Sequence, residues 1–169
     1  PNELISQLQR AHDLFDHFKI KTFEIPGFEA DDIIGPLAPK FATREATFDV
    51  VEIFSGDLDT LQLVSGDKIV AQFLIKGVTE TIVYNESAVV AKYGIPPRQL
   101  PEYKGFVGDS SDNIPGVKGV GPKTALPLIQ KYGTVENIFE HFAELTPPVQ
   151  KKLTGQRDTA ILARNLVTI

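Results

Sequence analysis

The chain contains no cysteine and no methionine among its 169 residues. Without cysteine it can form no disulfide framework and no thiolate metal site, so any metal ion must be held by oxygen or imidazole ligands. This absence also fits a reducing compartment. The missing methionine is compatible with removal of an initiator residue, and equally with a longer protein whose chain begins upstream of Pro1.

Long hydrophobic runs are missing as well. The longest apolar stretches, such as IIGPLA and VVEIF, are far shorter than the ~20 residues that a membrane-spanning helix needs. No signal-peptide pattern opens the chain. We therefore expect a cytoplasmic protein without a membrane partner, whose hydrophobic content of 42% suits a globular domain with a sizeable core.

Hydrophobic spacing in the first 41 residues predicts a helix, a short extended stretch and a second helix. The apolar, β-branched stretch at 48–54 then predicts a buried strand. Residues 68–84 alternate and turn at KGVTE, which is typical of a hairpin. This order of elements indicates an α/β fold with a mostly parallel sheet flanked by helices.

The second half of the sequence is expected to be mainly helical. A helix should run from Asn85 to Tyr93, because asparagine is a good N-terminal cap and Gly94 can end the helix. Helical patterns dominate from Ser110 onward, interrupted most sharply at GVKGVGP. The tail ARNLVTI could end as a strand.

The formal net charge of −5 at first argues against a nucleic-acid partner. The charges are unevenly distributed, however, because residues 113–134 contain three lysines and no acid. Seven acids gather elsewhere, at Glu29, Asp31, Asp32, Asp57, Asp59, Asp109 and Asp112. If bound cations neutralise these seven, the net charge changes from −5 to +2 and leaves a mildly basic surface.

The seven acids fall in three short stretches at the ends of expected elements: EADD at 29–32, GDLD at 56–59 and GDSSD at 108–112. Each stretch alone has an ordinary structural explanation. EADD can cap a helix, GDLD can form an Asx-turn, and GDSSD can form a turn or a cap. Three such stretches in one small domain are more economically interpreted as a single converging site, the more so because GDLD follows the carboxyl end of a buried strand.

Converging carboxylates without an apparent buried basic partner require cations. Oxygen ligands select Mg²⁺ or Mn²⁺, and the spacing required for an EF-hand calcium loop is not found. Seven carboxylates exceed the needs of one octahedral ion, which favours two ions and the phosphodiester hydrolysis that two-metal sites perform. The three histidines lie in expected helices and receive no catalytic role.

The stretch IPGVKGVGPKTA predicts a second kind of site, for phosphate. Its glycines permit tight turns and close approach, and Pro122 opens a helix whose free amides can hold an anion. Contacts of this kind grip the backbone rather than the bases, so binding should be independent of DNA sequence. The alternative is an ordinary corner between two helices. The predicted DNA-binding residues are Gly116, Val117, Lys118, Gly119, Val120, Gly121, Lys123 and Thr124.

Four ordered motifs closely resemble the 5′ nuclease domain of bacterial DNA polymerase I and the related flap endonucleases: GFEADDIIG, FSGDLDTLQLVS, YKGFVGDSSDNIPGVKGVGPKTA and KYGTVENI. The resemblance extends over the whole chain. It implies a PIN-like nuclease core followed by a helix-hairpin-helix subdomain, with a division at 1–108 and 109–169. It further implies that the seven acids surround two divalent ions, and that carbonyls of the hairpin, at Val117 and Val120, can hold K⁺.

The resemblance also implies what the family has and this sequence lacks. The family's domain opens with a strand that carries one more metal-binding aspartate, followed by a basic arch, and Pro1 matches a point after that arch. Three prolines, Pro36, Pro39 and Pro127, fall inside stretches that the family makes helical. The first two either displace the neighbouring acids by kinking the helix or leave its first turn intact.

The sequence therefore predicts a metal-dependent 5′-3′ exonuclease and structure-selective flap endonuclease, with catalytic roles for Asp31, Asp32, Asp57 and Asp59. Its expected partners are DNA with a 5′ flap, nick or gap, and a polymerase domain that is fused or separate. Two alternatives stay open. The first is a non-catalytic DNA-binding remnant of such a nuclease, and the second is a structural domain whose acids only cap helices.

Overall fold

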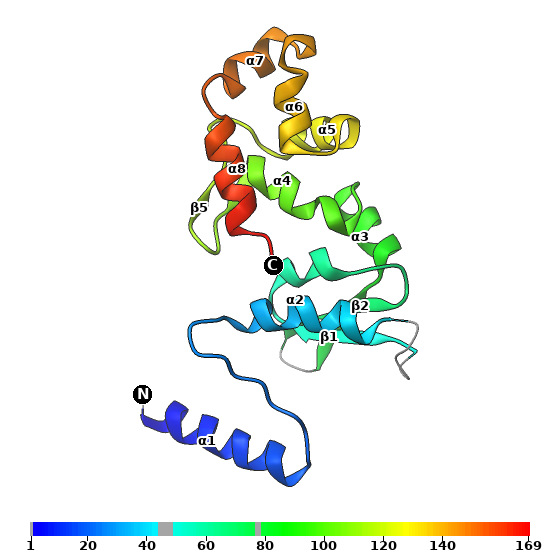
Figure 1. Cartoon of the computed structure of the whole chain (residues 1–169), viewed down its shortest axis with the longest axis vertical. Helices are drawn as coiled ribbons and strands as arrows, with labels where there is room; N and C mark the ends of the chain where they lie inside the picture. Colours follow the sequence, from blue (N-terminus) through cyan, green and yellow to red (C-terminus); the bar gives the residue numbers. More distant parts are fainter. Residues whose placement is uncertain (1, 44–48, 77–78) are drawn as a thin grey trace.

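The computed structural model describes residues 2–43, 49–76 and 79–169, in which helices outnumber strands (Figure 1). The N-terminal half contains α1 (Asn2–His17), α2 (Ala30–Phe41), β1 (Val51–Ser55), the 3-10 helix η1 (Leu58–Leu63), β2 (Ile69–Lys76), β3 (Glu80–Tyr84) and α3 (Glu86–Tyr93). The C-terminal half contains η2 (Pro97–Gln99), α4 (Leu100–Val107), β4 (Gly108–Asp109), β5 (Ile114–Pro115), α5 (Pro122–Tyr132), α6 (Val135–Glu140), η3 (Phe142–Glu144), α7 (Pro147–Leu153) and α8 (Arg157–Leu166). The predicted α/β class and the helical second half are confirmed.

The main sheet has three strands in the order β1-β2-β3. β1 and β2 pair in parallel, with Val51 opposite Ile69, and β2 pairs with β3 as the predicted antiparallel hairpin. The described sheet is therefore mixed. Phe48, where the first strand was expected to begin, and Gly77 and Val78 in the predicted turn lie outside the described residues.

α2 continues through both of its prolines. Proline has no N–H, so Pro36 leaves the carbonyl of Asp32 without its usual helical donor. Although this carbonyl belongs to the first turn, Asp31 and Asp32 remain within the helix. The prolines do not break the helix that carries these acids, and α5 likewise continues through Pro127.

α1 forms the predicted amphipathic helix, but it does not cover the sheet. Figure 1 shows it apart from the rest of the chain, at the end of the long segment that leads to α2. Its apolar side chains are consequently exposed, and Leu4, Ile5 and Leu8 each show more than half of their surface to solvent. No helix in the described ranges is long and apolar enough to cross a membrane.

The helical half is organised around the contact between α4 and α8. Gly105 permits this close approach, because a Cβ atom at that position would lie only 2.9 Å from the carbonyl oxygen of Ala160. Fully buried side chains from α4, α5, α6 and α7 belong to one hydrophobic core: Phe106, Ile129, Ile138 and Leu153. Since α4 leads directly into β4, this packing also fixes the position of the third acidic stretch.

The prediction that the tail ends as a strand is wrong. α8 ends at Leu166, and no strand follows it within the described residues. Instead, the side-chain amide of Gln62 in η1 forms hydrogen bonds with the backbone of the tail. Its Nε2 donates to the Val167 carbonyl (2.9 Å), and its Oε1 accepts from the Ile169 amide (3.0 Å). These two bonds hold the tail against η1, next to the GDLD stretch.

Candidate metal centre and phosphate-binding hairpin

The GDLD stretch forms the turn between β1 and η1. Asp57 caps η1, because its Oδ1 accepts a hydrogen bond from the Asp59 amide at 2.8 Å. Asp59 itself is buried, with 8% of its surface exposed. The Asx-type turn that the sequence allowed is therefore present. The turn uses one carboxylate oxygen of Asp57 and only the backbone amide of Asp59, so the carboxylate of Asp59 is available for other contacts.

The GDSSD stretch begins with the short strand β4 and continues into the turn that leads to β5. These strands approach unusually closely, since a Cβ atom on Gly116 would lie 2.3 Å from the amide nitrogen of Gly108. Gly108 also has a φ of +75°, which glycine adopts without strain. At the end of β4, Asp109 accepts a hydrogen bond from the Ser111 amide at 2.8 Å. This turn brings Asp109 and Asp112 back toward η1.

Three acids from these two stretches form one cluster. Asp59, Asp109 and Asp112 each offer a carboxylate oxygen, and these oxygens all lie within 4.8 Å of one another. Asp59 and Asp109 have side chains that are only 9% exposed, whereas Asp112 is exposed. Buried carboxylates this close together repel one another unless a cation lies among them.

One such cation is Lys104 of α4, which forms ion pairs with both Asp59 and Asp109. Its side chain is 21% exposed. The sequence interpretation that the acids lack a buried basic partner is therefore wrong. The sequence position of Lys104, five residues before Asp109, does not predict its contact with Asp59, because that contact depends on how α4 packs beside η1.

The pKa of Asp109 shows how strongly this environment favours the charged carboxylate. Burial raises the pKa of Asp109, but hydrogen bonds from Lys104 and from the hydroxyl and amide of Ser111 outweigh burial and lower that pKa to about 2. Asp109 is thus ionised at neutral pH. A deprotonated carboxylate is the form that a metal ion requires.

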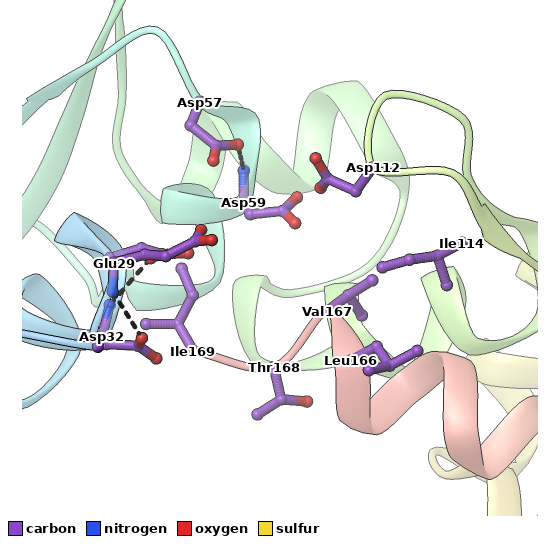
Figure 2. Close-up of a pocket in the computed structure, with 12 residues that line it drawn as sticks. Glu29, Asp32, Asp57, Asp59, Asp112, Ile114, Leu166, Val167, Thr168 and Ile169 are labelled. Carbon is purple, nitrogen blue, oxygen red and sulfur yellow. Dashed lines mark hydrogen bonds between the residues drawn. The ribbon is translucent and has the colours of Figure 1, made fainter.

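The EADD stretch lies on the other side of the same pocket, which has a volume of about 560 Å³ (Figure 2). Glu29, Asp31 and Asp32 begin α2, and the carboxylate of Asp32 accepts a hydrogen bond from the Glu29 amide at 3.0 Å. The predicted capping is therefore present here too. These three acids line the pocket together with Asp57, Asp59 and Asp112, and Asp109 adjoins it through the cluster.

The side chains present fit hard divalent cations. The pocket offers carboxylate oxygens from three separate segments. The ammonium group of Lys104 forms ion pairs with the carboxylates of Asp59 and Asp109, which shows that the site accommodates a cation. Mg²⁺ and Mn²⁺ prefer oxygen ligands of this type. Within the described ranges, only Asp59, Asp109 and Asp112 converge as a group of three, so the geometry defines one ion position more fully than a second.

Sequence reasoning missed the C-terminal tail as part of this pocket. Leu166, Val167, Thr168 and Ile169 line it across from Asp57, Asp59 and Asp112, and Figure 2 shows Ile169 beside Glu29. The tail occupies this position because Gln62 binds its backbone across more than a hundred residues of sequence. A contact over such a distance leaves no local pattern that could reveal it.

The predicted hairpin connects β5 to α5. Val117 and Val120 are buried, and the Val120 amide donates to the Val117 carbonyl at 3.0 Å, which closes the turn. Gly119 at its tip has a φ of +78° and open space around it. Gly121 precedes α5 and also faces open space. These two glycines leave their backbone accessible, whereas Gly116 is packed against β4.

Three lysines surround the start of α5. Lys118 and Lys123 are exposed on the hairpin and on the first turn of the helix. The third, Lys152 of α7, lies with its Nζ 3.5 Å from the hydroxyl oxygen of Thr124. Lys152 was not predicted, because it comes 28 residues after Thr124 and reaches it only through the packing of α7. Positive charge therefore extends beyond the predicted stretch.

Comparison with known proteins identifies the family. Residues 1–94 match the family model described as "5'-3' exonuclease, N-terminal resolvase-like domain", and residues 95–169 match "5'-3' exonuclease, C-terminal SAM fold". The chain belongs to the 5′-3′ exonuclease family. This confirms the resemblance found in the four motifs. A division of the chain at residue 108 stays a prediction.

Its relatives include enzymes of two lengths. DNA polymerase I of Bacillus subtilis (strain 168) is 41% identical over 170 residues, which cover 100% of this chain and 19% of that protein. A 5′-3′ exonuclease of Mycoplasma pneumoniae is 41% identical over 162 residues, which cover 95% of this chain and 54% of that protein. The chain thus spans about half of this exonuclease and about a fifth of the polymerase.

Solved structures confirm the PIN-like fold of the family. A 5′-exonuclease of bacteriophage T5 superimposes with a TM-score of 0.75 at 24% identity, covering 95% of this chain and 64% of that one. A flap endonuclease of bacteriophage T5, in complex with DNA and metal ions, gives a TM-score of 0.76 at 24% identity, covering 95% and 57%. The catalytic core of Rad2 in complex with DNA gives 0.61 at 16%, covering 96% and 55%.

Proposed function

We propose that the chain carries the metal-binding and DNA-binding parts of a 5′-3′ exonuclease and structure-selective flap endonuclease. The observation that supports this most is that acids from three separate stretches line one pocket. Membership of the 5′-3′ exonuclease family and likeness to a flap endonuclease solved with DNA and metal ions support the same activity. The substrate is DNA with a 5′ flap, a nick or a gap.

In this proposal Asp59, Asp109 and Asp112 hold one divalent ion, Mg²⁺ or Mn²⁺. Glu29, Asp31, Asp32 and Asp57 face the same pocket and contribute to a second position. Two such ions activate water and stabilise the negative charge that develops during phosphodiester hydrolysis. The chain's own contribution is to hold carboxylates at the start of α2, after β1 and around β4, where they face a single pocket.

The hairpin anchors the DNA in this proposal. The accessible backbone at Gly119 and Gly121 and the exposed lysines Lys118 and Lys123 contact phosphates, so binding does not depend on base sequence. The carbonyls of Val117 and Val120 are the proposed ligands of a K⁺ ion at this turn. Because a polymerase is among the close relatives, a fused or separate polymerase domain is the proposed protein partner.

The test combines metal binding and cleavage. The purified chain is titrated with Mn²⁺ in a calorimeter, and then incubated with a labelled 5′-flap duplex in Mg²⁺. We expect saturable metal binding and release of the flap strand. Asp59→Asn should abolish both, since this variant removes a charge from the centre of the cluster. Asp158→Asn, at an exposed position of α8, serves as the control and should change neither.

The outcomes separate the three functions that the sequence left open. Metal binding with cleavage supports the nuclease. DNA binding without cleavage at any Mg²⁺ or Mn²⁺ concentration would favour the non-catalytic remnant. If neither the wild-type protein nor Asp59→Asn binds Mn²⁺, the acids act only as caps and the metal proposal fails. Equal saturable binding by the two proteins would mean that the ion is held without Asp59, which also rejects the proposed site.

A further inference from the structure

Lys104 occupies an unusual position for a lysine in a metal-binding pocket. It extends from α4 and pairs with Asp59 at the start of η1 and with Asp109 at the end of β4. Both carboxylates are 9% exposed, so the contacts are largely shielded from water. A single ammonium group thereby joins the two acids that, with Asp112, form the convergent group of three.

An ammonium group and a divalent ion compete for these oxygens. Mg²⁺ binds carboxylates at about 2.0–2.1 Å and carries twice the charge of the ammonium group. A lysine that remained between the same two oxygens would face strong repulsion from the ion across a short distance in a poorly solvated site. Both cations therefore cannot hold the same oxygens of Asp59 and Asp109 at once.

We propose that Lys104 is the internal counter-ion of the metal site: it occupies the cation position between Asp59 and Asp109 in the metal-free protein and leaves when a divalent ion binds. This inference rests on the proposed function, because it assumes that the cluster binds metal. It has two consequences. Lys104 keeps the acids together in the metal-free fold, and it weakens metal binding because the ion must first displace it.

Two variants separate charge from size. Lys104→Met keeps a long, flexible side chain without the charge, whereas Lys104→Arg keeps the charge. Lys40→Met is the matched control, because it removes one lysine charge from the exposed last turn of α2, the helix that carries Asp31 and Asp32. Mn²⁺ affinity is measured by calorimetry on each full chain without DNA. The readout is thus independent of catalysis.

Lys104→Met should bind Mn²⁺ at least about fivefold more tightly than the wild-type protein, the lower end of usual coupling between two sites. Lys104→Arg and Lys40→Met should stay within about twofold of wild type, well below that coupling. In EDTA, Lys104→Met should melt at a lower temperature than wild type, and Mn²⁺ should raise its melting temperature by more. A purely structural lysine would lower stability without raising metal affinity.

A second measurement uses the wild-type protein and does not depend on the folding of a variant. With ¹⁵N-labelled lysine, the ammonium group of Lys104 should give a slowly exchanging NMR signal in EDTA, because it is hydrogen-bonded and partly buried. Saturating Mg²⁺ should remove or shift this signal, while the exposed lysines are unchanged. A signal that persists unchanged when the site is saturated overturns the proposal.

Failure of this inference differs from failure of the proposed function. If wild type and Lys104→Met bind Mn²⁺ with equal affinity, the site binds metal but Lys104 is not its counter-ion. Weaker binding by Lys104→Met also overturns the inference, because it would make the lysine a support for the ion. If no form of the protein binds Mn²⁺, both the metal site and the role of Lys104 are rejected.

Discussion

At the scale of single residues, capping and metal binding are not alternatives at this site. Asp57 accepts a hydrogen bond from the Asp59 amide, and Asp32 accepts one from the Glu29 amide. An ionised carboxylate has two oxygens and about four acceptor positions, so one amide bond leaves most of its capacity free. The caps orient these carboxylates, and the same side chains face the pocket.

Substitution of Asp57 should separate the two roles. Asp57→Asn retains an oxygen that can accept from the Asp59 amide, so the free energy of unfolding in EDTA should stay close to that of wild type. Asp57→Ala loses the cap and should unfold with about 1 kcal/mol less free energy. Both variants should bind Mn²⁺ more weakly, because both remove a charge.

Urea unfolding and calorimetric Mn²⁺ titration measure these two quantities on the same samples. If Asp57→Asn is destabilised as much as Asp57→Ala, the charge of Asp57 rather than its hydrogen bond stabilises the turn, and the prediction is wrong.

At the scale of elements, an ion-pair network holds three helices behind the pocket. Arg164 of α8 donates to Glu102 of α4 (3.0 Å) and to Glu136 of α6 (2.7 Å). Glu102 also accepts from the Val135 amide at the start of α6 (2.8 Å). Because α4 carries Lys104 and continues into β4, this network fixes the helix that brings the lysine and Asp109 together.

The network predicts part of the pH dependence of stability. Burial raises the pKa of Glu136, but a backbone hydrogen bond and Arg164 outweigh it and lower that pKa below its ordinary value. A depressed pKa stabilises the folded state above the pKa of the unfolded chain, at about 4.3, and this contribution is lost as pH falls through the folded-state pKa. As the pH falls below about 5, the Glu136→Gln variant should therefore lose less folding stability than the wild-type protein does.

The measurement is the melting temperature of both proteins across this pH range. Glu140→Gln, an exposed glutamate on the same helix, is the matched control and should follow the wild-type curve. Parallel curves for wild type and Glu136→Gln would show that Glu136 has the same pKa in the folded and unfolded chain, contrary to the expectation.

At the scale of the whole molecule, what the sequence could predict depended on the range of the contacts. Local patterns predicted α3, where Asn85 accepts from the Ala88 amide, and the β2-β3 hairpin. The convergence of the three acidic stretches was also predictable, because all three fall at the ends of expected elements and GDLD follows the carboxyl end of a buried strand.

Contacts between distant helices could not be predicted in the same way. Lys104 reaches Asp59 across 45 residues, and Gln62 reaches the Val167 carbonyl across 105. Neither pair has a spacing that marks it in the sequence, since each depends on how separate helices pack. These tertiary contacts supply the lysine in the acidic pocket and the tail that lines its other side.

The molecule carries a net charge of −5. If it binds DNA as proposed, the hairpin must act as a separate basic surface. Lys118 lies on that hairpin, whereas Lys131 is exposed in the last turn of α5. If Lys118 neutralises one phosphate, Lys118→Met should lower the slope of log K against log salt concentration by about 1. Lys131→Met removes the same charge and should leave this slope unchanged.

Fluorescence anisotropy with two duplexes of unrelated sequence, in EDTA and at several KCl concentrations, measures both slopes. Because phosphates are common to every sequence, Lys118→Met should weaken the binding of both duplexes by the same factor. A loss confined to one duplex would mean that Lys118 contacts bases. An equal change of slope for Lys131→Met would mean that the overall charge of the molecule, and not the hairpin, governs DNA binding.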